Sequence, residues 1–149
     1  MALIRNKKAR LAYAIEETLE AGIELHGFEV KSLKNGRGSL DGAYINLRGE
    51  EAFLVNAHIP PFQPANTPDD YDPYRLRRLL LNKRELAHLA GFERQKGLTI
   101  VPLSLYNKGG KIKVEIAVAR GKKKHDKRET IKRREAEREA RRALKSKER

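Results

Sequence analysis

The stretch LTIVPLSLYNKGGKIKVEIAV, residues 98–118, carries the clearest structural pattern in this 149-residue chain. It predicts two strands, residues 98–106 and 111–118, joined by a turn at Asn107-Lys108-Gly109-Gly110. A tight turn between two β-rich segments is the usual signature of an antiparallel hairpin.

The two faces of this predicted hairpin differ in polarity. In its second strand, Lys111, Lys113 and Glu115 alternate with β-branched residues, as expected when one face is buried and the other is exposed. Pro102 cannot donate a backbone hydrogen bond, so it predicts an edge or a bulge in the first strand.

Three more segments have strand character. Residues 12–25 predict a strand bent at Gly22, because most odd-numbered positions are apolar, and Glu20 then falls on the polar side. A helix over residues 11–19 is the alternative for the first part. Residues 43–48 and 51–59 predict a second hairpin around Arg48-Gly49-Glu50.

Two short helices are also predicted. Residues 27–34 fit a helix that ends at Asn35-Gly36. A second helix begins after Asn82, an N-cap residue, with Glu85 placed to complete a capping box. Capping alone therefore explains Asn82, and a contact between Asn82 and a ligand is the alternative interpretation.

Residues 60–74 contain five prolines and predict a surface loop. Asp69, Asp70 and Asp72 crowd this loop, and a metal-dependent nuclease would need such carboxylates. Because no second acidic cluster or placed histidine accompanies them, we interpret the loop as solvated.

These elements predict a mainly β fold, since at least five strands alternate with turn signals and only two or three short helices. An OB-like antiparallel β-barrel with flanking helices is the economical arrangement, because closure of a sheet removes exposed strand edges. Such a barrel offers a face and loops suited to oligonucleotides, but the fold alone fixes no function.

The C-terminal segment is strongly basic. Residues 120–149 hold fifteen Lys and Arg and six Asp and Glu, which supply most of the formal net charge of +13. We divide the chain into a body, residues 1–120, and a cationic tail, residues 121–149. The tail has too little apolar surface to fold alone, so we expect it to be disordered when free and helical when bound. Nucleic acid is the expected partner, whereas the narrow apolar stripe of the tail disfavours a membrane surface.

No catalytic or metal-binding motif stands out. Cysteine is absent, and the four histidines form no paired-ligand pattern, so we expect neither an enzyme nor a metal or cofactor site. His125 lies among lysines and arginines, where an imidazole could stack on a splayed base. A polar residue in a solvated charge run is the alternative interpretation.

Five blocks of sequence, taken in order, resemble the SsrA-binding protein (SmpB) family almost from end to end. The blocks are Asn6-Lys7-Lys8-Ala9-Arg10, Glu20-Ala21-Gly22-Ile23, GFEVKSL at residues 27–33, LLLNKREL at 79–86 and GKKKHDKR at 121–128.

The resemblance implies an RNA-binding protein of trans-translation that binds the tRNA-like domain of tmRNA and delivers it to stalled ribosomes. It implies a tmRNA-binding set on the body, consisting of Asn6, Glu20, Leu80, Asn82 and Lys113. It implies a tail that enters the decoding centre and the mRNA channel of the small ribosomal subunit through Lys122, Lys123, His125, Asp126, Lys127 and Arg128. Leu11 departs from the histidine that is frequent in the family at this position.

The resemblance also implies a cytoplasmic monomer that meets alanyl-tRNA synthetase and elongation factor Tu indirectly, through tmRNA. No secretory signal or membrane segment is predicted, which fits this location. A structural ribosomal protein and an RNA-processing enzyme are the competing interpretations. The first would sediment with every ribosome, and the second would cleave RNA in the presence of magnesium.

Overall fold

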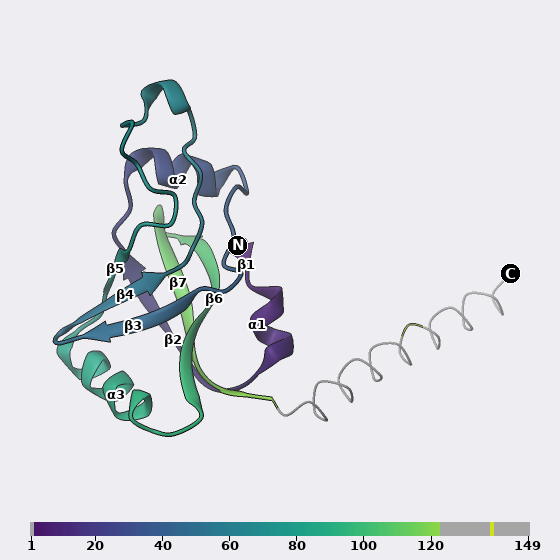
Figure 1. Cartoon of the computed structure of the whole chain (residues 1–149), viewed down its shortest axis with the longest axis vertical. Coiled ribbons are helices and arrows are strands. Elements are labelled where there is room, and N and C mark those ends of the chain that lie inside the picture. The colour runs from purple at the N-terminus through teal and green to yellow at the C-terminus, as the bar shows by residue number, and fades with distance from the viewer. Residues whose placement is uncertain (1, 123–137, 139–149) are drawn as a thin grey trace, which may run out of the picture.

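The computed structural model describes residues 2–122 and Arg138. This part of the chain forms one curved antiparallel sheet with three short α-helices around it (Figure 1). In chain order the elements are β1 (Ala2–Arg5), α1 (Lys7–Ala12), β2 (Tyr13–Ile23), α2 (Gly27–Lys34), β3 (Tyr44–Arg48), β4 (Glu51–Val55), a 3₁₀ turn (Pro64–Asn66), β5 (Arg77–Leu80), α3 (Lys83–Glu93), β6 (Leu98–Lys108) and β7 (Lys111–Gly121).

The predicted hairpin of β6 and β7 is the longest strand pair and is confirmed. Its strands pair from Leu98–Arg120 to Lys108–Lys111, and Gly109 and Gly110 form the turn with φ of 59° and 78°. Positive φ at both positions matches the twist of the strands, and glycine adopts it without a steric penalty. The register shifts between Pro102 and Ser104, so the proline marks a bulge.

The strand predicted over residues 12–25 is confirmed as β2, and the helical alternative for residues 11–19 is wrong. Helix is confined to α1, which ends at Ala12 before β2 begins. Asn6 caps α1, because its Oδ1 accepts a hydrogen bond from Ala9 N at 3.1 Å. This helix was not predicted, since its basic sequence has no apolar period.

The other predicted elements are also present, with some differences at their ends. Helices α2 and α3 and the hairpin of β3 and β4 lie where expected. Strand β4 ends at Val55, because Asn56 has a φ of 63° that breaks the extended backbone. Strands β1 and β5 were not predicted. β1 has four residues, and β5 starts with Arg77 and Arg78.

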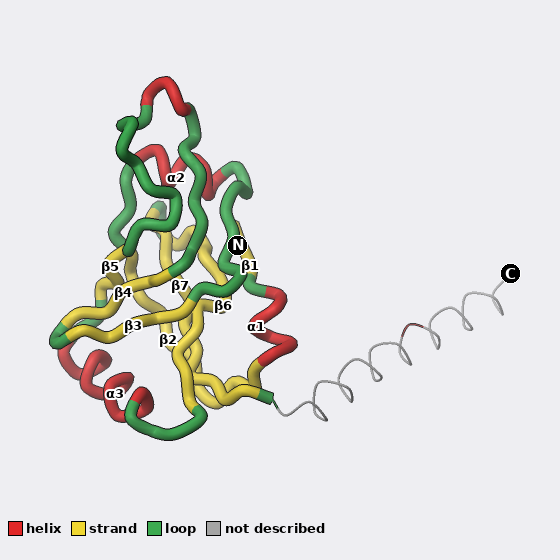
Figure 2. The backbone as a smooth tube through the Cα atoms, viewed as in Figure 1, coloured by secondary structure: helices red, strands yellow, loops and turns green. Residues whose placement is uncertain are grey.

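The sheet curls into an OB-like barrel that hydrogen bonds do not close completely. The strand order is β1-β6-β7-β2-β5-β4-β3, so β1 and β3 end the ladder, and β3 packs back against β6 (Figure 2). β1 pairs with Ser104, Leu105 and Tyr106 of β6. The part of β6 that precedes the bulge therefore packs against β3 along a seam, where the two strands form no ladder of backbone hydrogen bonds.

Two apolar clusters hold this architecture together. The larger cluster fills the barrel and includes the fully buried Leu54, Leu105 and Ile116. A smaller cluster on the outer face of β6 and β7 packs Ala9 of α1 against Leu103. Apolar contact therefore holds α1 against the outside of the barrel.

The tail begins at the end of β7. Gly121 pairs with Tyr13, and Lys122 N donates to Ala12 O at 2.9 Å, so the body holds the chain to this point. The predicted disorder and induced helicity of the tail fall on residues outside the described part. Within the described residues, no helix is long and apolar enough to cross a bilayer.

Candidate nucleic-acid interface

Gly22 lies at the centre of the surface that the resemblance singled out. It is the Cα partner of Leu80 on β5 and of Lys113 on β7, and Lys113 is in turn the partner of Tyr106 on β6. One row of residues therefore crosses four strands on the outer face of the barrel. We call this region the Leu80 surface, and it consists of Glu20, Gly22, Leu80, Asn82, Tyr106, Lys108 and Lys113.

Leu80 is a large apolar side chain on an open face, with 49% of its surface exposed. It borders a groove of about 260 Å³ that is also lined by Gly22, Leu25, Lys111 and Lys113. An added Cβ at Gly22 would lie 3.1 Å from Leu80 Cβ, so only glycine leaves Leu80 in this position without displacement. The result is an apolar platform with ammonium groups beside it, which suits a base and its phosphate.

Glu20 is the acidic member of the surface and is held by its neighbours. The Tyr106 hydroxyl donates to Glu20 Oε2, and Lys108 Nζ lies 3.2 Å from the same oxygen. The Tyr106 hydrogen bond is the main cause that lowers the pKa of Glu20, with the two lysines adding to it. Burial, and then the hydrogen bond to Glu20, raise the pKa of Tyr106. Glu20 is therefore an ionised acceptor. Lys108 Nζ also lies 3.3 Å from its Oε1, which keeps a lone pair that can accept from a base edge.

Asn82 serves α3 and also faces solvent. Its Oδ1 accepts from Glu85 N at 2.8 Å, and Glu85 Oε1 accepts from Asn82 N at 3.1 Å, which confirms the predicted capping box. The residue is exposed, and its Nδ2 donates to no other described residue. The cap thus fixes Asn82 and leaves an amide donor directed to solvent.

Asn6 differs from the other predicted body residues, because it is only 2% exposed. Its Nδ2 donates to Pro102 O at 2.9 Å, and its backbone N donates to Leu103 O at 2.8 Å. These bonds join the start of α1 to the β6 bulge. The structure therefore brings Glu20, Leu80, Asn82 and Lys113 together. It places Asn6 apart from them, buried between the start of α1 and the bulge of β6.

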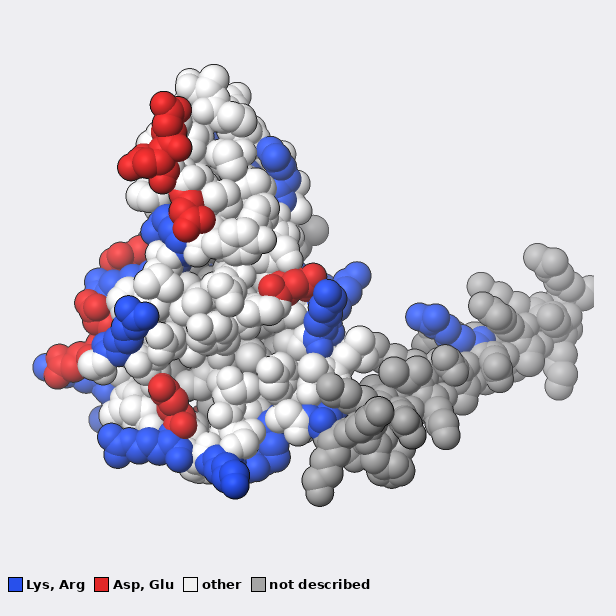
Figure 3. All heavy atoms as spheres, in the orientation of Figure 1, with Lys and Arg blue, Asp and Glu red and all other residues white. Residues whose placement is uncertain are grey.

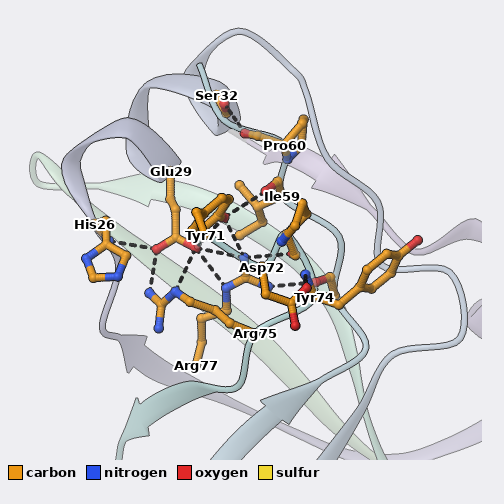
Figure 4. A network of polar contacts seen from close by, with 12 residues as sticks. His26, Glu29, Ser32, Ile59, Pro60, Tyr71, Asp72, Tyr74, Arg75 and Arg77 are labelled. Carbon is orange, nitrogen blue, oxygen red and sulfur yellow. Dashed lines mark hydrogen bonds and ion pairs between the residues drawn. The ribbon is translucent and has the colours of Figure 1, made fainter. Parts of the chain in front are cut away.

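A buried network of charged side chains, which the sequence did not predict, links several elements of the barrel (Figure 4). Glu29 of α2 is fully buried and accepts hydrogen bonds from Arg75, Arg77 and Tyr71. Arg77 Nη1 also donates to Ala57 O at 2.6 Å. The Tyr71 hydroxyl has one proton, which is shared between Glu29 Oε2 at 2.8 Å and Ile59 O at 2.7 Å. The network joins α2, the proline loop and β5. It thereby fixes the strand that carries Leu80.

The hydrogen bonds of the network shift two pKa values in opposite directions. Burial opposes ionisation of Glu29, but the hydrogen bonds from Arg75, the His26 backbone and Arg77 outweigh it and lower its pKa to about 2. Burial and the hydrogen bond to Glu29 raise the pKa of Tyr71 to about 12. The paired arginines therefore neutralise a permanent buried carboxylate.

Of the three aspartates of the proline loop, Asp72 has a local structural contact. Asp72 Oδ1 accepts from Tyr74 N at 2.9 Å, which fixes the turn that leads into β5. Among the described residues, no group of three His, Asp or Glu is placed to hold a metal ion.

On the face shown in Figure 3, a group of acidic side chains lies on the projecting proline loop, and Lys and Arg side chains lie along the opposite end, near α3 and the start of the tail. Between the two ends, acidic and basic side chains are mixed. Of the predicted ribosome-contacting set, only Lys122 is described. The remaining members, Lys123, His125, Asp126, Lys127 and Arg128, lie outside the described residues.

Together these features define a class of protein: a small β-barrel with an RNA-compatible face and a basic C-terminal extension. The SmpB protein family model matches residues 3–146. The chain is 51% identical over 140 residues to the SsrA-binding protein of Chloroflexus aggregans, covering 94% of this chain and 89% of the relative. It is 49% identical over 146 residues to that of Geobacillus thermodenitrificans, covering 98% and 94%.

A solved structure described as tmRNA-SmpB at the centre of the bacterial ribosome has the same fold. It matches with a TM-score of 0.68 and 42% identity, over 86% of this chain and 93% of that one. The chain therefore belongs to the SmpB protein family.

Proposed function

We propose that this protein binds the tRNA-like domain of tmRNA and delivers it to stalled ribosomes in trans-translation. The observation that carries the proposal is the 42% identity, over most of both chains, to a structure of tmRNA-SmpB in the ribosome. The Leu80 surface supports it, because a half-exposed leucine, lysines and a fixed carboxylate are brought together on one face.

On this surface each residue has a separate task. Leu80 packs against an unpaired base or sugar, and Lys113 contacts a phosphate. Glu20 and Asn82 accept and donate hydrogen bonds at fixed positions, which selects a folded RNA rather than any polyanion. Asn6 acts indirectly, by holding α1 against the barrel.

The tail has the second task in this proposal. The tail, whose first residues Gly121 and Lys122 are bonded to the body, enters the rRNA-lined decoding centre and mRNA channel of the small subunit. Lys122, Lys123, Lys127 and Arg128 neutralise phosphates, while His125 and Asp126 make the directional contacts. The body binds tmRNA selectively, and the tail binds in the mRNA channel when that channel is empty.

The remaining features of the proposal follow from this role. The protein acts as a cytoplasmic monomer, without a cofactor or a catalytic step of its own. Alanyl-tRNA synthetase and elongation factor Tu join it only through tmRNA.

Binding to the isolated tRNA-like domain of tmRNA tests the proposal. A Lys113→Ala variant is compared with the native protein and with Lys34→Ala, an exposed lysine on α2. We expect Lys113→Ala to weaken binding by about 1 kcal/mol or more, because one phosphate contact is lost. The slope of log K against log salt should fall in magnitude by about 1, whereas Lys34→Ala should have little effect. Equal effects of the two variants, or no preference for this RNA over a transfer RNA, would refute it.

A further inference from the structure

The proline loop, residues 60–74, carries a groove that the proposed function does not use. The groove has a volume of about 240 Å³ and is lined by four proline rings, Thr67, Asp69 and Tyr71. It shares no residue with the Leu80 surface. Its volume is below the range of sites that hold a whole small molecule, so it suits a single side chain of a partner.

The loop that forms this groove is held at both ends and at its tip. Ser32 Oγ donates to Pro60 O at 2.5 Å, and Arg77 Nη2 donates to Pro73 O at 2.9 Å. At the tip, Thr67 Oγ1 donates to Gln63 O at 2.9 Å. Because the prolines also have a fixed φ, the groove is formed before a partner arrives, and binding costs little ordering of the loop.

The charge of the loop is opposite to that of the chain as a whole. Residues 60–74 contain three aspartates and no Lys or Arg, whereas the chain has a formal net charge of +13. Asp69 is exposed where it lines the groove, and no cation among the described residues pairs with it. Such a loop repels the phosphates of RNA and attracts a positively charged protein segment.

We propose that the groove binds an arginine side chain from a basic, extended segment of a partner protein. The methylene groups of the arginine pack on the proline rings, and its guanidinium pairs with Asp69. Arginine is preferred over lysine, because its planar guanidinium donates two parallel hydrogen bonds to one carboxylate. This inference goes beyond the function proposed above, since the partner is a protein and the site lies outside the RNA-binding residues.

The test measures binding of a labelled octapeptide of alternating glycine and arginine to the full-length protein by fluorescence anisotropy. Asp69→Asn is expected to weaken binding about 1.5- to 5-fold, the effect of losing an exposed ion pair. Asp69→Lys replaces attraction by repulsion and is expected to weaken binding further. Pro68→Ala removes two methylene groups from the wall, and each one that the peptide covers contributes about 4-fold in affinity.

Each variant has a matched control. Glu93→Lys makes the same change of charge as Asp69→Lys at an exposed position on α3 and should leave peptide binding nearly unchanged. Pro60→Ala removes a proline of the same loop that does not line the groove. The proposal is overturned if either pair of variants binds alike, or if an octapeptide of alternating glycine and lysine binds as tightly as the arginine peptide.

Two further measurements identify the partner class. Asp69→Asn should bind the tRNA-like domain like the native protein, and a weaker RNA complex would overturn the proposal by assigning the loop to RNA. Sedimentation of the full-length protein should show no dimer that Asp69→Lys disrupts, since such a dimer would make a second copy the partner. Leu80→Ala should lose RNA affinity and retain peptide affinity, so failure of this site and failure of the proposed function are distinguishable.

Discussion

Glu29 and Arg77 form an ion pair between two fully buried side chains, with Arg77 Nη2 2.7 Å and Nε 3.0 Å from Glu29 Oε2. Glu29 comes from α2 and Arg77 from β5, so the pair connects elements 48 residues apart. Removal of either partner would leave the other charge buried without compensation, which is far more costly than loss of a surface pair.

We therefore expect Glu29→Ala to lower the free energy of unfolding by about 3–5 kcal/mol. Glu24→Ala is the control, because Glu24 pairs with Arg78 at 3.1 Å where both side chains are about half exposed. Its expected effect is below about 1 kcal/mol. Denaturant unfolding of both variants provides the comparison, and similar losses would show that the buried network does not stabilise the fold.

The same pair predicts a pH dependence. The pKa of Glu29 falls from 4.5 to about 2 on folding, so its contribution is complete above the unfolded pKa and is lost as pH falls towards the folded value. The stability difference between the native protein and Glu29→Gln should be constant above about pH 5 and should shrink steadily below it. A difference that stays constant down to pH 3 would contradict the assigned ion pair.

Leu80 should contribute to RNA binding more than to stability. We expect Leu80→Ala to weaken binding to the tRNA-like domain by about 1–2 kcal/mol, because it removes the apolar platform at the centre of the surface. Leu76→Ala is a closely matched control, since Leu76 is 42% exposed and Leu80 is 49% exposed. Fluorescence anisotropy and thermal unfolding of both variants test this. Equal binding by the two variants would remove Leu80 from the interface.

Gly22 should be required for the position of Leu80. In Gly22→Ala the new Cβ would lie 3.1 Å from Leu80 Cβ and 3.3 Å from Cδ1, so Leu80 must move by a few tenths of an ångström. We expect weaker RNA binding and a loss of about 1–2 kcal/mol in stability. In Gly91→Ala, an added Cβ has no neighbour within 4 Å, and the helix should gain up to about 1 kcal/mol. Unimpaired RNA binding by Gly22→Ala would contradict the prediction.

Tyr106 should set the ionisation of Glu20. Its hydroxyl is the main cause of the lowered pKa of Glu20, so Tyr106→Phe should raise that pKa towards the ordinary value. Glu20 would then take up its proton at higher pH than in the native protein. Carbon-13 shifts of the Glu20 carboxyl during an acid titration report this directly. Tyr74→Phe serves as the control, and an unchanged midpoint in Tyr106→Phe would disprove the coupling.

The sequence predicted those parts of the fold whose signals are local. The β6–β7 hairpin follows from alternation over consecutive residues, and the α3 cap follows from Asn82 and Glu85, three positions apart. β5 was missed because Arg77 and Arg78 lack strand character and only the β2 and β4 neighbours make this segment a strand. β1 was missed because a four-residue edge strand has almost no pattern.

The candidate site likewise contains residues that the sequence indicated and residues that only the tertiary structure reveals. Glu20, Leu80, Asn82 and Lys113 were named through the family resemblance, and only the register around Gly22 reveals that they share a surface. Glu29 was missed as a structural centre, because carboxylates are seldom fully buried and its partners lie 42, 46 and 48 residues away. The signal in the sequence that could have indicated a buried carboxylate was the pair Arg75 and Arg77, next to the proline-rich loop.

The central claim is that the body selects tmRNA and the tail acts on the ribosome. The most direct test is a protein truncated after Lys122, which keeps the pairing of Gly121 with Tyr13 and the bond of Lys122 to Ala12. Binding to the tRNA-like domain of tmRNA and tagging of nascent chains on stalled ribosomes are measured with the same preparation. The account predicts RNA binding within a few-fold of the native protein and no tagging. Loss of RNA binding on truncation, or tagging that continues without the tail, would contradict it.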